Sequence, residues 1–420
     1  VRPIGEAVLG VSHAMEKFPS ARALARSLAP INPVTCLRPH AVRRAVHFFL
    51  NAFPGEILYA VKTNPRPEVL DEVYDAGVRN FDVASLAEIE LIAGRYPDAK
   101  MAFMNPVKNR DVIRRAYEEF RVRHFVLDSE EELKKIVEAT GHAQDLSLLV
   151  RLAVPNHHSE LELSSKYGVQ PDAAPDLLIA ARQVASRLGV AFHVGSQCMQ
   201  PSAWGTALHM VRDLILKSGI ILDIVDVGGG FPSVYPYMTP PPLTDYMREI
   251  TAAVDKLPIS ESCEIWAEPG RALVAEGAST LVRVEMRRGD NLYINDGTYG
   301  SLFDAGSLNF IYPVRPIRTE GRFQKPLIGY AFYGPTCDSL DHMKGPFYLP
   351  ADMREGDYIE IGQTGAYGCA MRTKFNGFHS DETVVLRDEP MLTAYGDRIA
   401  AQNDTTAGLS GSAVLLEQMK

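Results

Sequence analysis

The sequence predicts an α/β protein in which a TIM-like (β/α)8 barrel is followed by a smaller, all-β domain. Between residues 57 and 267, eight short apolar strands alternate with stretches of helical periodicity. Such alternation is typical of parallel strands joined by right-handed helical crossovers. Eight units in about 240 residues match the size of a closed barrel. After Arg271 the helical periodicity fades, and short strands separated by turn signals indicate a β domain.

The individual barrel elements follow from this pattern. The expected strands are Ile57–Val61, Phe81–Ala84, Met101–Met104, His124–Leu127, Leu146–Val154, Val190–Val194, Leu222–Val227 and Glu264–Ala267. The helices expected between them are Pro67–Ala76, Leu86–Arg95, Arg110–Phe120, Glu130–Ala139, Ala174–Leu188, Ala203–Lys217 and Leu243–Lys256. An open, doubly wound sheet is the alternative, but no G-x-G-x-x-G motif follows the first strand.

A further strand is expected at Val34–Leu37, before the barrel pattern begins. The strands expected in the β domain are Thr280–Met286, Asn291–Asn295, Tyr312–Ile317, Leu327–Tyr333, Tyr358–Ile361 and Thr383–Leu386. We therefore place the barrel domain at residues 32–271. Residues 1–31 and 272–420 form the β domain, with an N-terminal segment and a C-terminal tail.

The composition is that of an ordinary globular protein, with 46% hydrophobic and 23% charged residues among 420. A formal net charge of -9 argues against a nucleic-acid surface. No apolar run approaches the roughly 20 residues of a membrane span, and the first residues lack a signal peptide's apolar segment. The five cysteines are widely spread and match no zinc-site spacing, which indicates free thiols. We therefore expect a cytoplasmic protein without a metal, a nucleic-acid partner or a membrane.

Lys62 ends the first expected barrel strand, in Tyr59-Ala-Val-Lys62-Thr63-Asn64. We expect the pKa of a lysine in such a partly dry position to fall. A neutral amine is a nucleophile for carbonyl compounds, so a Schiff base is the chemistry that this residue offers. Taken alone, Lys62 is better explained as an ordinary lysine at a strand end, whose ammonium group reaches water at the barrel rim.

Three other strand ends carry unusual residues, and the active sites of such barrels lie at the carboxyl ends of the strands. They are His193-Val194-Gly195-Ser196, Gly228-Gly229-Gly230-Phe231-Pro232 and Glu268-Pro269-Gly270-Arg271. Consecutive glycines expose backbone N–H groups to an anion, and barrels often bind phosphate after strands seven and eight. Arg271 and Ser196 offer further contacts to the same phosphate.

Glu268 and His193 each have two interpretations. A salt bridge to Arg271 explains Glu268, and a satisfied core histidine explains His193. Beside a Schiff-base lysine and a phosphate cradle, however, a carboxylate can keep a pyridine nitrogen protonated, so that the ring accepts electrons. The imidazole can stack on the same ring.

The β domain contributes two more motifs. Tyr333–Asp341 places Cys337 and Asp338 at a strand exit, although buried thiols and turn acids are common without any function. Gly365-Ala366-Tyr367-Gly368 is a glycine-flanked tyrosine that structure explains about as well as function does.

Together these motifs resemble the fold-type III, pyridoxal-phosphate-dependent basic amino-acid decarboxylases, the ornithine decarboxylase group. The similarity runs from about Pro33 to Asp388. It consists of Tyr-Ala-Val-Lys-x-Asn, His-Val-Gly-Ser, Gly-Gly-Gly-Phe-Pro, Glu-Pro-Gly-Arg and Gly-Pro-Thr-Cys-Asp-Ser-Leu-Asp, in that order. No single motif is specific, whereas the ordered set is. The resemblance implies an alanine racemase-like barrel that binds pyridoxal 5'-phosphate.

The resemblance also implies roles for individual residues. Lys62 forms the Schiff base, Glu268 pairs with the pyridine nitrogen, and His193 stacks on the ring. Asp82 matches an aspartate close to the lysine, and Arg151 matches an arginine near the cofactor. The implied phosphate ligands are Ser196, Gly229, Gly230, Arg271 and Tyr367.

By the same resemblance, the active form is a head-to-tail homodimer with two shared active sites. Cys337 and Asp338 then reach the neighbouring subunit's site, where the thiol assists protonation of the carbanion and the carboxylate binds the distal amine. Lys166 matches a lysine at that interface. The loop at 299–309 departs from the family pattern, and Asp304 is the candidate there for a second acid on the distal amine.

The implied activity is that of a lyase in polyamine biosynthesis, which decarboxylates a basic L-amino acid, with L-ornithine converted to putrescine. Lysine is the nearest alternative substrate. A diaminopimelate decarboxylase needs basic groups for a second carboxylate, where this chain offers acids. A carboxynorspermidine-type decarboxylase remains a further alternative. A non-catalytic regulator of the same fold is disfavoured, because such proteins lose cofactor-site residues. This chain keeps Lys62, His193, Glu268, Arg271, Cys337 and Asp338.

Overall fold

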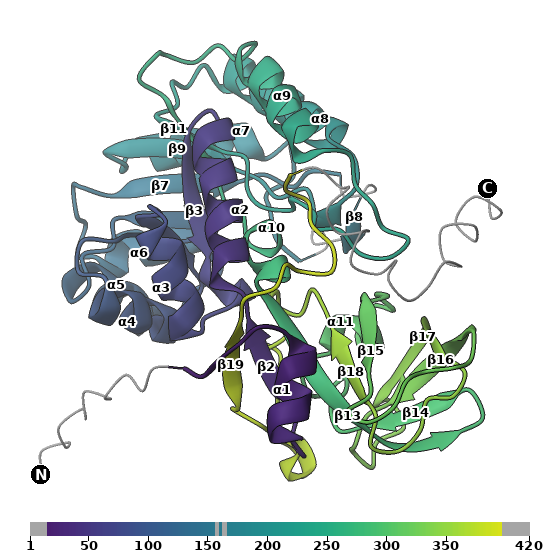
Figure 1. The fold of residues 1–420 in the computed structure, drawn as a ribbon. Helices are drawn as coiled ribbons and strands as arrows, with labels where there is room; N and C mark the ends of the chain where they lie inside the picture. The colour runs from purple at the N-terminus through teal and green to yellow at the C-terminus, as the bar shows by residue number, and fades with distance from the viewer. Residues whose placement is uncertain (1–14, 156–158, 162–165, 397–420) are drawn as a thin grey trace, which may run out of the picture.

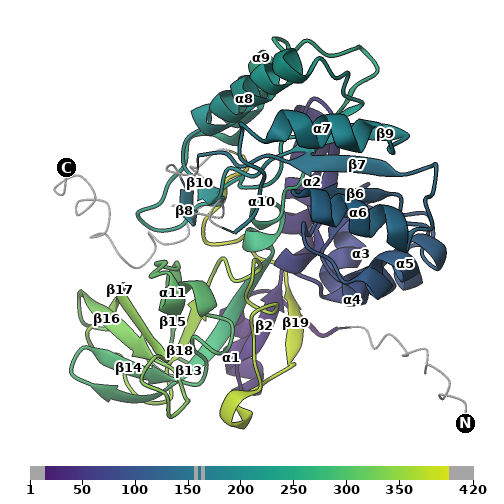
Figure 2. The same ribbon diagram turned by 180° about the vertical axis from the view of Figure 1, so that it is seen from behind.

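The computed structural model describes residues 15–155, 159–161 and 166–396. It contains a closed barrel and a nine-stranded sheet that lie side by side (Figures 1 and 2). Among the described residues, none of the helices has the length and apolar character needed to cross a membrane. All five cysteines are free thiols.

Eight strands close the barrel, and each pairs in parallel with its neighbours. They are β3 (Glu56–Ala60), β4 (Asn80–Val83), β5 (Lys100–Phe103), β6 (His124–Leu127), β7 (Ser147–Arg151), β9 (Arg187–Ala191), β11 (Ile224–Asp226) and β12 (Glu264–Ala267). The predicted (β/α)8 barrel is thereby confirmed. A short antiparallel pair, β8 (Ser159–Leu161) with β10 (Ser196–Cys198), lies outside it.

Helices cover the outside of the barrel, as Figures 1 and 2 show. They are α2 (Pro39–Ala52), α3 (Pro67–Asp75), α4 (Leu86–Arg95), α5 (Arg110–Glu118), α6 (Glu130–Ala139), α7 (Ala174–Arg182), α8 (Ser202–Ser218), α9 (Leu243–Val254) and α10 (Arg271–Val274). Ser85, Asn109 and Ser129 begin α4, α5 and α6, where each side chain accepts hydrogen bonds from the first turn. Proline stands in the first turn of α2, α3 and α7, where its missing N–H costs nothing.

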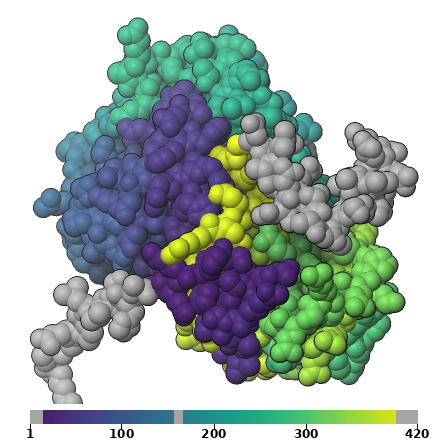
Figure 3. Space-filling model, viewed as in Figure 1, coloured from purple at the N-terminus to yellow at the C-terminus, as the bar shows by residue number. Residues whose placement is uncertain are grey.

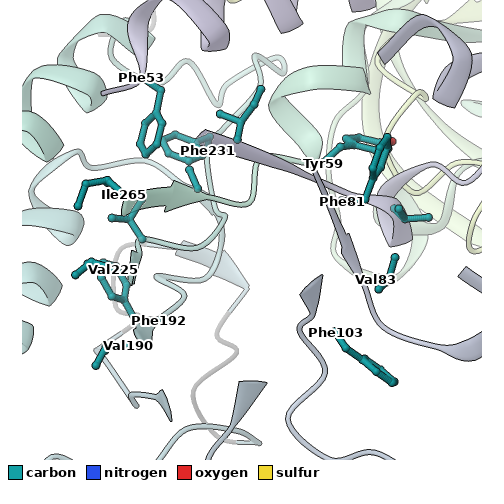
Figure 4. Close-up of a cluster of buried hydrophobic side chains, with 14 of the residues drawn as sticks. Phe53, Tyr59, Phe81, Val83, Phe103, Val190, Phe192, Val225, Phe231 and Ile265 are labelled. Atoms are coloured by element: carbon teal, nitrogen blue, oxygen red, sulfur yellow. The ribbon is translucent and has the colours of Figure 1, made fainter. Parts of the chain in front are cut away.

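Buried aromatic and branched side chains fill the space between the strands and these helices (Figure 4). Phe231 follows the glycine run directly and is fully buried. Its ring centroid lies 5.2 Å from that of Phe49 on α2 and 4.8 Å from that of Trp204 on α8. Because aromatic pairs at such distances pack favourably, Phe231 fixes the glycine loop against the helices.

The second domain is a nine-stranded, mainly antiparallel sheet with the path β1-β19-β2-β13-β14-β16-β17, and β18 joins β13 to β15. The strands are β1 (Lys17–Phe18), β2 (Val34–Leu37), β13 (Ala278–Arg288), β14 (Asn291–Ile294), β15 (Val314–Ile317), β16 (Leu327–Tyr333), β17 (His342–Pro350), β18 (Tyr358–Ile361) and β19 (Thr383–Leu386). Helix α1 (Ala21–Leu28) precedes β2.

Three features of this domain were not anticipated from the sequence. Strand β2, at the start of the predicted barrel range, pairs with β13 and β19 of the sheet. Strand β17 was missed because Gly345-Pro346 resembles a turn, yet β17 is an edge strand, where a proline is tolerated. The short helix α11 (Phe303–Ser307) was missed as well.

The described part of the C-terminal region crosses back over the barrel at residues 388–395, seen as a yellow band beside α2 in Figure 3. Its Tyr395 hydroxyl donates to the Ala272 carbonyl at 2.7 Å. Glu276, after α10, accepts from the Thr393 hydroxyl at 2.7 Å and from the Ala394 N–H. Arg44 on α2 pairs with Glu389 at 2.7 Å.

Glu276 gives this contact a pH dependence, since burial raises the pKa of its carboxyl from 4.5 to about 7. The folded state therefore holds the Glu276 proton more tightly than the unfolded state does. Its contribution to the free energy of unfolding falls as the pH rises from about 4.5 to about 7, by roughly 2–3 kcal/mol.

Glu276→Gln should lose this pH-dependent contribution to the free energy of unfolding, because glutamine keeps a hydrogen-bond acceptor but does not ionise. Urea unfolding of both proteins at about pH 5.5 and about pH 8 measures the difference. We expect the variant to gain stability relative to the native chain at the higher pH. Parallel pH profiles for the two proteins would contradict the prediction.

Candidate active site

The residues predicted from the strand ends converge at the carboxyl end of the barrel. Lys62 lies in the 3-10 turn η1 (Val61–Thr63), directly after β3. Asp82 on β4 is the register partner of Ala60 on β3. The Lys62 Nζ atom lies 2.9 Å from Asp82 Oδ2, and 44% of the lysine side chain is exposed, whereas the Asp82 side chain is 2% exposed.

The pKa of Lys62 differs from the sequence expectation. Burial lowers the pKa of the amine, but the carboxyl groups of Asp82 and Glu268 raise it by more, so that it lies above its ordinary value. The prediction of a lowered pKa was wrong because it took no account of a carboxylate within hydrogen-bonding distance. Lys62 must therefore give up a proton before it attacks a carbonyl, and Asp82 is the adjacent acceptor.

His193 follows β9 and is held as a neutral imidazole. Burial lowers its pKa well below the ordinary value, and the cations Arg151 and Lys62 lower it further. The Gly195 N–H donates to Nδ1 at 3.0 Å, so the hydrogen of the neutral ring is on Nε2.

Two of the predicted phosphate-binding glycines are required by close packing. A Cβ on Gly229 would lie 2.6 Å from the Glu268 carbonyl oxygen and 3.0 Å from His193 Nε2. Gly230 has a φ of +110°, and its Cβ would lie 2.4 Å from the Gly195 carbonyl oxygen. The glycine loop thus brings the ends of β9, β11 and β12 together, and a side chain at either position would separate them.

Glu268 and Asp226 form a buried pair of acids at the ends of β12 and β11. Glu268 is 7% exposed, and burial followed by the charges of Asp226 and Asp82 raises its pKa well above the ordinary value. Asp226 is fully buried, which raises its pKa to about 6, while its Oδ1 accepts from the Gly228 N–H at 2.8 Å. Two such acids favour holding one proton between them.

Arg271 is 4% exposed and uses one nitrogen for its protein contacts. Its Nη1 donates to the Tyr235 hydroxyl at 2.9 Å and to Asp304 Oδ2 at 2.8 Å. Its Nε and Nη2 are buried without a hydrogen-bond partner in the described structure. Two unsatisfied, cationic N–H groups on one edge of a guanidinium fit an oxyanion such as a phosphate.

Asp304, which the sequence predicted to bind a substrate's distal amine, lies beside Arg271 in the structure. Asp304 lies in α11, is 3% exposed and is ion-paired with Arg271. The loop that departs from the family pattern folds inward as a helix, which brings its acid to the arginine.

Residues from the sheet domain complete one wall of the site. Tyr367 has a φ of +61°, and its N–H donates to the Thr63 carbonyl at 2.9 Å. Its ring centroid lies 5.0 Å from the Arg271 guanidinium. The Asn64 amide donates to the Gly365 carbonyl at 2.7 Å. The turn that carries Tyr367 is therefore fastened to the segment that carries Lys62.

Cys337 and Asp338 follow β16, and their side-chain contacts lie within the sheet domain. Asn376 Oδ1 accepts from Cys337 N and Sγ at 3.2 and 3.3 Å. The Tyr299 hydroxyl donates to Asp338 Oδ2 at 2.5 Å. Hydrogen bonds from the Leu340 N–H and from Tyr299 lower the pKa of Asp338. We call Tyr299, Cys337, Asp338, Phe375 and Asn376 the outer cluster.

Residues 40–275 match the family model described as "Pyridoxal-dependent decarboxylase, pyridoxal binding domain". The chain belongs to this family. It is 34% identical over 359 residues to an ornithine decarboxylase of Panagrellus redivivus, which covers 80% of each chain. It is 30% identical over 357 residues to a lysine/ornithine decarboxylase of Selenomonas ruminantium, covering 83% of this chain and 87% of the relative.

A solved structure supports the same grouping. The lysine/ornithine decarboxylase from Vibrio vulnificus, complexed with cadaverine, superposes with a TM-score of 0.74 at 29% identity. The match covers 88% of this chain and all of the other. This decarboxylase is therefore an enzyme of the pyridoxal-phosphate-dependent carboxy-lyase type, and pyridoxal 5'-phosphate is its cofactor.

Sequence reasoning missed several residues of this decarboxylase's site. Asp226 had a signal, since an acid stands in the apolar run Ile224–Val227 just before the glycines. Tyr235 and Asn376 had none, because each reaches its partner, Arg271 or Cys337, only through the folding of distant segments. Lys166 is described and exposed, and its ammonium lies 5.0 Å from the Tyr167 ring centroid.

Proposed function

We propose that this enzyme decarboxylates a basic L-amino acid, with L-ornithine as substrate and putrescine as product, and that Lys62 binds the cofactor as a Schiff base. The observation that carries the proposal is the convergence of Lys62, Asp82, His193 and Glu268 at one end of the barrel. The name of the Panagrellus relative supports the choice of ornithine, and that of the Selenomonas relative includes both lysine and ornithine.

When bound, pyridoxal phosphate supplies an aromatic ring that accepts the electrons left by departing carbon dioxide. The chain's residues then have separate tasks. Glu268, with Asp226 behind it, holds a proton for the ring nitrogen. His193 would pack its neutral ring against the cofactor, and Arg151, the last residue of β7, lies near enough to lower the pKa of His193. The phosphate is held by Arg271, Tyr367, Ser196 and the N–H groups of Gly229 and Gly230.

We further propose that Cys337 and Asp338 act in the site of a second subunit. Phe375 in the outer cluster and the nearby residues Leu340 and Phe378 have exposed apolar side chains, a kind of surface that marks protein contacts. A head-to-tail homodimer would cover it and bring Asp338, ionised at neutral pH, to the distal amine of the substrate. Cys337 would then return a proton to the α-carbon.

Asp338 also argues against the alternative substrates with a second carboxylate. A diaminopimelate decarboxylase needs a cation at the distal position, for the second carboxylate of its substrate, whereas the outer cluster presents a carboxylate there. Carboxynorspermidine has one carboxylate and amines at its far end, so Asp338 does not exclude it. Lysine differs from ornithine by one methylene and remains the nearest competitor. A non-catalytic regulator, the other class considered, would be expected to lack the strand-end residues that converge here.

Carbon dioxide release from ornithine, lysine, arginine and meso-diaminopimelate tests the proposal. We expect the largest kcat/KM for ornithine, a value about 10–200-fold lower for lysine, and no turnover of diaminopimelate. Asp338→Asn should raise the KM for ornithine more than it lowers kcat, with Asp381→Asn, an exposed acid in the loop before β19, as the matched control. Preferred turnover of diaminopimelate would overturn the substrate assignment.

A further inference from the structure

The contacts of Arg271 raise a question that the proposed function leaves open. A buried guanidinium needs partners on all of its N–H groups, yet within residues 15–155, 159–161 and 166–396 this one is satisfied at a single nitrogen. Both hydrogens of Nη1 are taken, one by Tyr235 and one by Asp304. The Nε and Nη2 groups form the edge that binds an oxyanion in a bidentate manner, and this whole edge is left available.

We propose that Asp304 is a positioning residue for the cofactor phosphate, which together with Tyr235 fixes one side of Arg271 so that Nε and Nη2 face the phosphate. The proposal rests on the proposed assignment of Arg271 to that phosphate. It replaces a role in substrate binding with a role in cofactor binding.

The fold holds Asp304 firmly in this place. Its carbonyl accepts from the Leu308 N–H at 3.0 Å and from the Phe310 N–H at 3.1 Å, which closes α11 around it. Gly306 lets this helix approach Thr298, since a Cβ there would lie 1.9 Å from the threonine Oγ1. An acid held by its own backbone can fix the arginine without moving itself.

Aromatic rings limit the other motions of the guanidinium. Its central carbon lies 5.2 Å from the Phe310 ring centroid, 5.0 Å from that of Tyr367 and 5.9 Å from that of Tyr235. Rings on several sides favour the cation through their π faces. The carboxylate of Asp304 supplies the counter-charge that a buried arginine otherwise lacks.

The test separates the phosphate from the rest of the cofactor. The full-length chain, freed of cofactor, is titrated with pyridoxal phosphate and with pyridoxal, which has no phosphate, while the change in ligand absorbance is followed. Asp304→Ala should weaken the binding of pyridoxal phosphate by about 10–100-fold. At metal sites, loss of a residue that hydrogen-bonds to a metal ligand lowers the affinity for the metal by a similar factor. The binding of pyridoxal should change by less than about twofold, because pyridoxal has no group for Arg271 to hold.

Two further variants guard against a merely structural effect. Asp304→Asn keeps an acceptor for Nη1 and should restore most of the affinity. Tyr235→Phe removes the other acceptor but keeps the ring, so it should weaken pyridoxal phosphate binding and spare pyridoxal. Equal losses for both ligands in Asp304→Ala and Tyr235→Phe would overturn the proposal. A raised KM for ornithine with unchanged cofactor affinity would return Asp304 to substrate binding.

An Arg271→Lys variant distinguishes failure of this inference from failure of the assignment beneath it. If Arg271→Lys binds pyridoxal phosphate as tightly as the native chain does, the arginine does not hold the phosphate, and the proposed function itself needs revision. If Arg271→Lys loses affinity while Asp304→Ala keeps it, only the positioning role is lost.

Discussion

Replacing Lys62 by alanine is expected to abolish covalent cofactor binding and to lower carbon dioxide release by at least roughly 10³-fold, because the nucleophile and its proton are removed together. Borohydride reduction of the native holoenzyme should add the mass of the reduced cofactor to the peptide that contains Lys62. The same treatment of Lys62→Ala should leave that peptide unmodified, and the visible absorbance of the bound cofactor should be lost.

The matched control for this variant is Lys62→Arg. Arginine keeps a cation beside Asp82, so the buried carboxylate keeps its partner, but a guanidinium does not form a Schiff base under these conditions. Loss of the adduct in both variants with little loss of thermal stability in Lys62→Arg would attribute the effect to chemistry. An adduct that persists on another lysine with full activity would contradict the assignment of Lys62.

Mixing two inactive variants, Lys62→Ala and Cys337→Ala, is expected to restore activity. In a head-to-tail dimer with shared sites, half of the randomly reassociated dimers contain one chain of each kind. One of their two sites then has both native residues, so about a quarter of the native activity should return. The variants are mixed after brief dissociation in mild denaturant, and carbon dioxide release is measured after reassociation.

A second mixture provides the control. Lys62 and Glu268 belong to the same barrel, so a dimer of Lys62→Ala with Glu268→Ala has no site in which both are native. This mixture should remain inactive at every ratio. Recovery in both mixtures would show that the regained activity does not depend on a shared site. Recovery in neither mixture would argue against Cys337 acting across subunits.

The barrel and the first group of site residues were predictable because both depend on local patterns. Strand and helix periodicities differ, and the carboxyl ends of parallel strands meet at one edge, so Lys62, His193, Glu268 and the glycines could be placed together from the sequence. The structure confirms the barrel and brings these residues to its carboxyl end.

The features that the sequence did not reveal share a physical cause, which is that contacts between distant segments decide them. The pKa of Lys62 depends on the distance to Asp82 on the next strand. The role of Asp304 depends on the inward folding of α11 toward an arginine 33 residues earlier. Strand β17 forms in spite of Gly345-Pro346 because the neighbouring strand β16 supplies its hydrogen bonds. Periodicity along the chain carries no information on such pairings.

The hydrogen bonds of Thr63 and Asn64 to the turn at residues 365–367 have a consequence for cofactor retention. Under the proposed assignment, the phosphate ligands come from the barrel and, through Tyr367, from the sheet domain. Cofactor binding and alignment of the domains are then thermodynamically linked, since a ligand that binds only the aligned form stabilises that alignment by mass action. Substitutions at these contacts between the two domains should shorten the residence time of the cofactor. The rate of the chemical step in enzyme that holds the cofactor should stay the same.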